Sequence, residues 1–294
     1  MLRALVVYKK SAYQLYVVER RDTHLVRLLR QGHPDTRDIQ QAHDVHQKTL
    51  DHVLQTLKML HVPYRVVYRG HLRASTSQRS DLVISVGGDG TLLQAAHALR
   101  DTPILGVNSD RQRSEAVFCA ATRHTFARII RAALAGTLTE RLLYRLHVRL
   151  NGRIVGPLVL NDVLIAHQDP ATMSRYRIKI GASQEAQKSS GLWVATAAGS
   201  SSAILAAGGR PVTWSAKRFQ YRPRELYRGR LSRYRLTGGV LEMGQTVEVR
   251  WLMREGAVFV DGPHVRLPVR FGDWVVVALS PHHPLRILGV RGPQ

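Results

Sequence analysis

Residues 82–93 read Leu-Val-Ile-Ser-Val-Gly-Gly-Asp-Gly-Thr-Leu-Leu. The apolar run at the start of this stretch is typical of a buried strand, and a helix is predicted over residues 91–99. A strand that passes through three glycines into a helix favours a phosphate-binding loop at the edge of an α/β sheet. The unpaired N–H groups and positive dipole end of the helix attract phosphate. We therefore predict phosphate contacts at Gly87, Gly88, Gly90 and Thr91.

Asp89 lies at the centre of this loop. A carboxylate repels phosphate, so its position predicts a base that accepts a proton from an attacking hydroxyl group. The alternative is a glycine-rich turn in which Asp89 only caps the following helix. The strand before the loop, the helix after it and the acid between them together favour the base.

The rest of the first half alternates between strand-like and helix-like segments. Apolar residues recur every three or four positions in 38–60 and 122–135, which indicates helices. Short strands are predicted at 5–8, 64–68 and 104–107. This alternation predicts a parallel, doubly wound α/β domain over residues 1–140. Asn108 directly follows a strand at the same sheet edge as the glycine loop, so it is either a ligand contact or a turn residue.

The second half changes to short β segments separated by turns, with only 200–207 helical. This pattern predicts a β-rich, sandwich-like domain over residues 141–275, packed by the four tryptophans, and a C-terminal segment, 276–294, that returns to the first domain. The strands are expected at 145–150, 160–165, 175–180, 191–195, 231–236, 246–251, 257–260 and 274–279.

Composition restricts the class of protein. The formal charge is +22, and only seven of the 43 basic residues are lysine. Nucleic-acid binding, recognition of small phosphate-rich molecules and a dispersed arginine bias each account for this charge, with nucleic acid ranked last because no basic block or tail occurs. No apolar run approaches the roughly 18 residues of a membrane span. A lone cysteine, Cys119, fits a reducing cytoplasm. The 14 histidines have no matching Cys or acidic cluster, so no metal site held directly by protein side chains is predicted.

Two further segments carry side chains suited to a nucleotide. Asn161 offers the donor and acceptor that an adenine edge requires, and Asp162 suits ribose hydroxyls, although Asn-Asp is also a common turn. Residues 199–202 read Gly-Ser-Ser-Ser before a predicted helix. Small hydroxyls at that position either cap the helix or contact phosphate and ribose, and both roles are compatible.

Taken in order, these segments resemble the NAD kinase family. Of these segments, only the Gly-Gly-Asp-Gly-Thr loop is also found in diacylglycerol and sphingosine kinases. The Asn161-Asp162 pair, the Gly199-Ser200-Ser201 stretch, Gly208-Gly209 and the Asp261-Gly262 turn follow in the family's order. The resemblance implies transfer of the γ-phosphoryl group of ATP, as its Mg²⁺ complex, to the adenosine 2′-hydroxyl of NAD or NADH, with Asp89 as base. It also implies NAD contacts at Asn108, Asn161, Asp162, Ser200 and Ser201, and a homo-oligomer, either a dimer or a tetramer.

The chain departs from the common bacterial pattern of this family. Residues 108–115 read Asn-Ser-Asp-Arg-Gln-Arg-Ser-Glu instead of Asn-x-Gly-x-Leu-Gly-Phe-Leu, and Ala203 stands where the common pattern has a tyrosine. These departures resemble the divergent plant-type and mitochondrial-type branch. The choice between NAD and NADH, the choice between ATP and polyphosphate as donor, and the regulators stay open. The alternatives are a lipid kinase of the same superfamily and a non-enzymatic nucleic-acid-binding protein.

Overall fold

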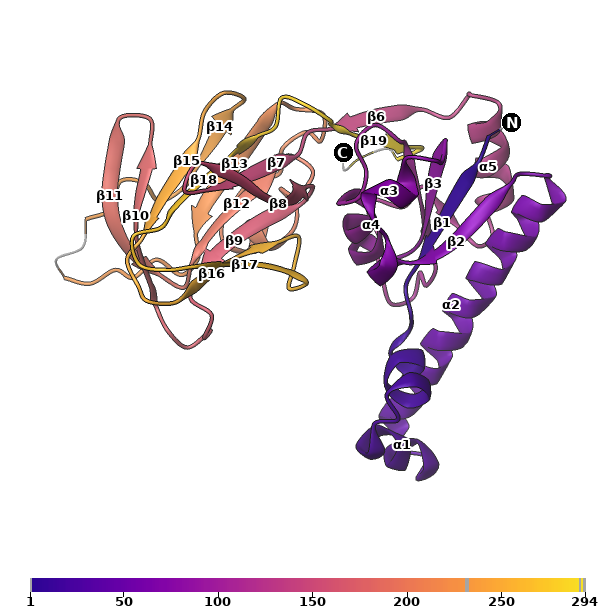
Figure 1. Cartoon of the computed structure of the whole chain (residues 1–294). Helices are drawn as coiled ribbons and strands as arrows, with labels where there is room; N and C mark the ends of the chain where they lie inside the picture. The colour runs from indigo at the N-terminus through magenta and orange to yellow at the C-terminus, as the bar shows by residue number, and fades with distance from the viewer. Residues whose placement is uncertain (1, 231–232, 291, 293–294) are drawn as a thin grey trace. The chain divides into compact units, whose positions relative to one another are not determined.

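The computed structural model describes residues 2–230, 233–290 and 292. The chain divides into two compact units, Met1–Arg141 with Arg286–Gly292, and Leu142–Leu285. Each unit has its own sheets and its own core (Figure 1). Throughout these described ranges, no helix is both long and apolar enough to cross a bilayer.

The first unit is built on one sheet with the order β2-β1-β3-β4-β19-β6, and β5 pairs with β4. The pairs β1–β2, β1–β3, β3–β4 and β4–β19 are all parallel. The strands are β1 (Ala4–Tyr8), β2 (Tyr64–Tyr68), β3 (Leu82–Gly87), β4 (Ile104–Asn108), β5 (Ala121–Thr122), β6 (Glu140–Leu143) and β19 (Leu285–Leu288).

Helices cover both faces of this sheet (Figure 1). The helices of this unit are η1 (Tyr13–Glu19), α1 (Thr23–Arg30), α2 (Pro34–Met59), η2 (Arg69–His71), α3 (Ala74–Ser77), α4 (Asp89–Ala96) and α5 (Phe126–Leu134). Of these, η1 and α1 pack against α2, at the end of that helix away from the sheet. Buried residues of α2 and α5, such as Val53 and Ile130, share one core with Val6 and Ile84 of the sheet. Because successive strand residues point to opposite faces, Val83 faces the other side, where α4 packs against β3.

The second unit is a sandwich of two six-stranded antiparallel sheets, with the orders β11-β10-β15-β18-β7-β8 and β14-β13-β12-β9-β16-β17. Its core contains inward-facing residues of both sheets, including Tyr176 and Trp251 from the first and Val194 and Phe219 from the second. The elements are β7 (Leu146–Leu150), β8 (Arg153–Val159), β9 (Asp162–Ala166), β10 (Ser174–Ile180), β11 (Ser183–Ser189), β12 (Leu192–Thr196), α6 (Ala203–Ala206), β13 (Arg218–Pro223), β14 (Gly239–Glu242), β15 (Val247–Trp251), β16 (Gly256–Val260), β17 (Val265–Val269) and β18 (Trp274–Leu279).

The predicted fold class, a doubly wound α/β domain followed by a β-sandwich-like domain, is confirmed. Three local predictions need correction. A strand was expected at 231–236, but residues 231–232 lie outside the described residues and 233–236 form no strand. There the backbone N–H groups of Arg235 and Leu236 donate to the side chain of Glu185 instead of to a neighbouring strand.

The second correction concerns the C-terminal segment. Residues 276–279 complete β18 in the sandwich, so the part that belongs to the first unit begins at Arg286 and not at residue 276. The third concerns the tryptophans. Trp214 and Trp251 are buried, but Trp274 is 38% exposed because it begins β18 on the outer face of its sheet.

Candidate active site

The glycine loop connects β3 to α4 at the carboxyl end of a central strand, as predicted, but α4 begins at Asp89, two residues before the predicted helix start. Gly88 is the N-cap of α4 and makes no side-chain cap, and Asp89 is the first helical residue. The capping alternative for Asp89 therefore fails. Its carboxylate instead accepts hydrogen bonds from the backbone N–H groups of Val117, at 3.0 Å, and Phe118, at 2.9 Å.

These two amides belong to a loop that sequence reasoning did not assign to the site. The loop turns at Ala116, whose φ of 48° lies in the left-handed region. It then runs beside β4 so closely that a Cβ atom on Gly106 would lie 2.6 Å from the carbonyl oxygen of Phe118. A glycine within a predicted buried strand was the available signal, because such a residue often marks a close backbone approach.

The environment of Asp89 alters its acidity. Burial raises the pKa of Asp89 above its ordinary value, the two backbone hydrogen bonds oppose that rise, and the nearby charge of Glu115 adds to it. A raised pKa makes a carboxylate a stronger base. The carboxylate is thus both fixed in orientation and more basic than an exposed aspartate.

The three glycines of the loop differ in what a side chain at each position would meet. A Cβ atom on Gly87 would lie 2.7 Å from Cβ of Thr91, and one on Gly88 would lie 2.7 Å from Oγ of Ser114. A Cβ atom on Gly90 would meet nothing within 4 Å. Gly87 and Gly88 therefore permit close packing within the protein, whereas Gly90 faces open space, where a ligand has room to approach.

Thr91 does not present a donor to a phosphate in this structure. Its side chain is buried against Gly87, and its backbone N–H donates to the carbonyl oxygen of Gly88 at 2.9 Å. Its hydroxyl has no hydrogen-bond partner among the described residues. The predicted phosphate contact at Thr91 would thus require the start of α4 to rearrange.

Asn108 ends β4 and holds the loop that follows it. Its amide nitrogen donates to the carbonyl oxygen of Ser114 at 2.8 Å, and its side-chain oxygen accepts from the backbone N–H of Asp110 at 2.9 Å. Both ends of the amide are therefore engaged in the loop, as the turn alternative expected. Asn108 also lines a hollow of about 480 Å³. That hollow further includes Val45, Thr49, Ser109, Asp110, Arg111, Gln112, Thr122, Arg123 and His124.

The predicted nucleotide residues of the second unit gather around the start of β9. The Asn161 amide nitrogen donates to Oδ2 of Asp162 at 3.1 Å and to Oγ of Ser202 at 3.2 Å. Ser202 in turn donates to Oδ2 of Asp162 at 3.0 Å. The structure thus brings Asn161 and Asp162 together with Ser202, which is one residue beyond the predicted Ser201.

The three serines at residues 200–202 differ in their surroundings. Ser200 is buried, and its hydroxyl accepts from the backbone N–H of Val212 at 2.8 Å, so it anchors a neighbouring segment. Ser201 is exposed. Ser202 precedes α6 but makes no side-chain cap to it. The helix-capping alternative for this stretch is therefore not what the structure shows.

Asp261 completes this cluster from the turn after β16. Its carboxylate accepts from the backbone N–H groups of Leu160, Asn161 and Asp162, at 2.9, 2.7 and 3.1 Å. Burial raises the pKa of Asp162 to about 6, with the charge of Asp261 adding to the rise and the Ser202 hydrogen bond opposing it. The Asp-Gly turn was visible in the sequence, but its role as an anchor for the start of β9 was not.

No three histidine, cysteine or acidic side chains among the described residues form a group that could hold a metal ion. The candidate site residues include three carboxylates, those of Asp89 in the first unit and of Asp162 and Asp261 in the second. Carboxylates are the protein ligands that Mg²⁺ uses beside substrate phosphates, usually one or two at a time. Asp89 beside a phosphate-type loop fits that limited role.

The comparisons with known proteins agree with this architecture and these motifs. Residues 10–136 match the family model described as the ATP-NAD kinase N-terminal domain. A probable NADH kinase of Oryza sativa is 37% identical over 256 residues, which cover 80% of this chain and 78% of that protein. The NADH kinase of Arabidopsis thaliana is 32% identical over 267 residues, with 80% of each chain covered.

Two further matches come from other branches of life. The mitochondrial NAD kinase 2 of Mus musculus is 31% identical over 157 residues, which cover 50% of this chain and 34% of that protein. An Archaeoglobus fulgidus NAD kinase, solved in complex with ATP, superposes with a TM-score of 0.68 at 21% identity, covering 99% of this chain and 94% of that one. The latter match establishes a shared fold.

A two-unit chain with a Gly-Gly-Asp-Gly-Thr loop in its α/β unit belongs to the class of small-molecule kinases. The extended similarity to the plant enzymes narrows that class, and the chain belongs to the NAD kinase family. The resemblance to the plant-type and mitochondrial-type branch is confirmed. The lipid-kinase alternative fails, because the matches extend through both units to kinases of NAD and NADH.

Proposed function

We propose that the protein transfers the γ-phosphoryl group of ATP to the 2′-hydroxyl of the adenosine ribose of NAD(H). The 2′-oxygen forms a bond to the γ-phosphorus, the bond between that phosphorus and the β,γ-bridging oxygen breaks, and ADP leaves. The proton of the hydroxyl passes to a carboxylate oxygen of Asp89. The products are NADP(H) and ADP.

The observation that carries this proposal is the Asp89 carboxylate held by the amides of Val117 and Phe118. A base must be aimed at the hydroxyl proton, and two hydrogen bonds to a fixed loop remove its rotational freedom. Phosphoryl transfer otherwise depends on positioning and charge stabilisation, with Mg²⁺ neutralising the donor phosphates. Gly90, which faces open space, leaves room for those phosphates next to the base.

In the second unit, we assign the nucleotide contacts to the cluster around β9. Asn161 suits an adenine edge, and Asp162 suits a ribose hydroxyl once it is ionised. Ser202 holds both side chains in place through its hydrogen bonds. Contacts from Asn108, Ser200 and Ser201 remain predictions, and Ser201 is the exposed one of the two serines.

NADH is the proposed acceptor alongside NAD, since the two plant relatives are named a probable NADH kinase and an NADH kinase. A homo-oligomer and a cytoplasmic location are further proposals, the first from the family resemblance and the second from the single cysteine, Cys119. Burial raises the pKa of that thiol, so it stays protonated and poorly reactive, as suits a structural residue.

The test is NADP(H) formation by the purified chain with ATP, Mg²⁺ and either NAD or NADH. We expect product with both acceptors. Polyphosphate in place of ATP examines the donor in the same assay. If neither dinucleotide gives product with either donor, the proposed reaction is wrong.

A further inference from the structure

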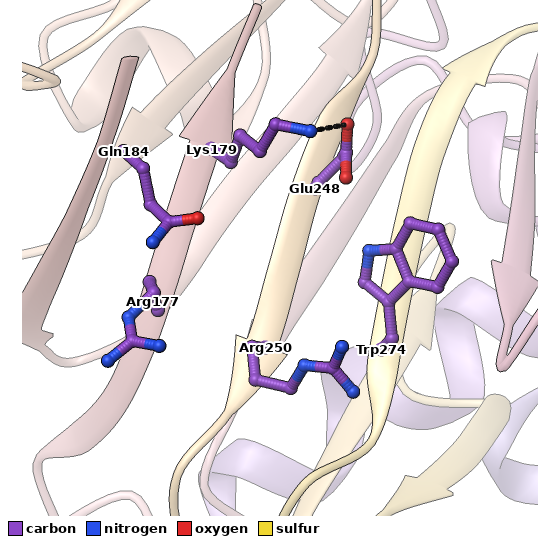
Figure 2. Close-up of a pocket in the computed structure, with 6 residues that line it drawn as sticks. All are labelled: Arg177, Lys179, Gln184, Glu248, Arg250 and Trp274. Atoms are coloured by element: carbon purple, nitrogen blue, oxygen red, sulfur yellow. Dashed lines mark hydrogen bonds and ion pairs between the residues drawn. The ribbon is translucent and has the colours of Figure 1, made fainter. Parts of the chain in front are cut away.

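The outer face of the β11-β10-β15-β18-β7-β8 sheet carries an arrangement that the proposed reaction does not use. Arg177 of β10 lies directly opposite Arg250 of β15, and Arg250 lies directly opposite Trp274 of β18. The three side chains therefore form a row across adjacent strands, about 5 Å apart per strand. Figure 2 shows these three side chains on the same side of the sheet, with Arg250 extending toward the indole ring of Trp274 and Arg177 turned away from Arg250.

This row forms one side of a hollow of about 280 Å³. Lys179, Glu248 and Gln184 form the rest of its lining (Figure 2). The Lys179 ammonium pairs with the Glu248 carboxylate at 3.1 Å, so these two charges satisfy each other. Arg177 and Arg250, in contrast, have no acidic side chain next to them in the row.

Two arginines directly opposite each other on neighbouring strands repel, and such pairs destabilise a sheet. Arg250 donates to the carbonyl oxygen of Gly272 at 2.7 Å, and its guanidinium carbon lies 6.0 Å from the centroid of the Trp274 ring. Arg177 is exposed. An anion between the two guanidinium groups would remove the repulsion, and the fork of each group matches phosphate geometry.

Trp274 supplies the second half of the recognition. The ring is 38% exposed and stands at the edge of the hollow, beside the cations, instead of packing in the core. Nucleobases stack on exposed aromatic rings of sheet surfaces, and Trp offers the largest such platform. A ligand with a phosphate and a flat base joined by one sugar could contact the arginines and the Trp274 ring at the same time.

We propose that this hollow binds a free mononucleotide, with its phosphate between Arg177 and Arg250 and its base against Trp274. The residues that line the hollow all belong to the second unit and include none of the predicted kinase-site residues, and the proposal does not rest on the proposed kinase function. The size of the hollow is near the lower limit for small-molecule sites, roughly 300 Å³, which suits one nucleotide.

The charge on the surrounding face favours a mononucleotide over a second copy of the chain and over a nucleic-acid strand. Strand pairing places six cations on the face, Arg149, Arg175, Arg177, Lys179, Lys188 and Arg250, against one acid, Glu248, a surplus of five. A second copy of the chain would bring the same surplus against itself in a two-fold contact. Along a nucleic-acid strand, Glu248 would oppose a phosphate track on that side of the hollow.

The probe is 5′-AMP, titrated calorimetrically into the full-length protein. Because AMP also resembles ligands of a kinase site, the number of sites is the readout. We expect one more site in the normal protein than in Arg177→Gln/Arg250→Gln, with KM for ATP and for NAD(H) unchanged. The matched control is Arg149→Gln/Arg175→Gln, which removes the same charge from the same face outside the hollow and should bind as many AMP molecules as the normal protein.

A third variant, Trp274→Ala, separates base stacking from phosphate binding. It should weaken AMP at this site about tenfold, as expected for loss of one stacked base, and leave binding of inorganic phosphate unchanged. AMP-dependent quenching of tryptophan fluorescence should disappear in Trp274→Phe. All these side chains lie on a surface, and unchanged melting temperatures would confirm that each variant is folded.

Several results would overturn the proposal. Equal isotherms for the normal protein and the Arg177/Arg250 variant would show that the hollow is empty of nucleotide. An equal loss in the Arg149/Arg175 control would show diffuse surface charge only. Unchanged AMP affinity in Trp274→Ala would reduce the site to an anion site. Single-stranded hexathymidylate that binds over tenfold more tightly than AMP, and depends on Arg149 and Arg175, would assign the face to nucleic acid instead.

Discussion

The backbone N–H of Phe118 donates a hydrogen bond to Oδ1 of Asp89 across 29 residues of sequence, at 2.9 Å. The loop that carries Phe118 is pressed against β4 at Gly106, where a Cβ atom would lie 2.6 Å from the Phe118 carbonyl oxygen. The geometry of the proposed base thus depends on the absence of a side chain at Gly106.

Gly106→Ala tests that dependence. The new methyl group would displace the backbone at Phe118 and Cys119, so we expect a loss of about 1–3 kcal/mol in the free energy of unfolding, as for overpacked cores. The same shift moves the amides away from Asp89, so kcat should fall as well. Denaturant unfolding and steady-state kinetics measure the two effects. A variant that is less stable but keeps its full kcat would break the link between Gly106 and the base.

Gly87 and Gly90 should respond differently to alanine. Gly87→Ala places a methyl group against Thr91 and should destabilise the first unit by about 1–3 kcal/mol. Gly90→Ala meets open space and should leave stability nearly unchanged, while obstructing phosphate and raising KM for ATP. Thermal melts and ATP kinetics on the pair provide the comparison. Normal ATP kinetics in Gly90→Ala would remove this position from the phosphate site.

Ser202→Ala and Ser201→Ala form a matched pair in the second unit. Ser202 holds Asn161 and Asp162, whereas Ser201 is exposed. Loss of a hydrogen bond to a charged group corresponds to roughly tenfold in affinity. We therefore expect KM for NAD(H) to rise about that much in Ser202→Ala and less in Ser201→Ala. The reverse order would favour the contact predicted from sequence, at Ser201.

The raised pKa of Asp162 should make the stability of the folded protein depend on pH. Its pKa is about 6 in the folded chain, against an ordinary value of 3.8. Folding therefore favours the protonated form of Asp162. The stability that this form contributes is fully present below the unfolded pKa of 3.8 and is lost as the pH rises through about 6. The difference of about two pKa units corresponds to on the order of 3 kcal/mol.

The measurement is urea unfolding of the normal protein and Asp162→Asn between pH 4 and pH 7.5. The stability of the normal protein relative to the variant should fall across this interval. A relative stability that rises with pH would show that the pKa of Asp162 is lowered instead. Over the same interval, KM for NAD should decrease in the normal protein as Asp162 ionises and accepts from the ribose.

Local patterns were sufficient for much of the architecture. The run 82–86 and the glycines after it predicted β3, the loop and α4, because strand burial and helix initiation are encoded within a few residues. The helix predicted at 38–60 was found as α2, beginning at Pro34, a residue that suits the first helical position. Alternating segments likewise predicted the change from α/β to sandwich near residue 140.

Long-range contacts were not accessible in this way. The amides that orient Asp89 come from a loop 28 and 29 residues later, and the carboxylate that anchors the start of β9 comes from Asp261, about 100 residues later. The row of Arg177, Arg250 and Trp274 depends on the register of three strands far apart in sequence. Residue type predicted which side chains can do the chemistry, but pairing decided which of them meet.

The role of Asp89 is the central claim, and the rate of phosphoryl transfer in a single turnover tests it most directly. Asp89→Asn keeps the size of the side chain and removes the base, so enzyme in excess over NAD(H), with saturating ATP and Mg²⁺, should form NADP(H) about 10²–10⁴-fold more slowly. Glu115→Gln removes a nearby charge as the control and should retain most of the rate. A transfer rate in Asp89→Asn within a few-fold of the normal protein would contradict the account.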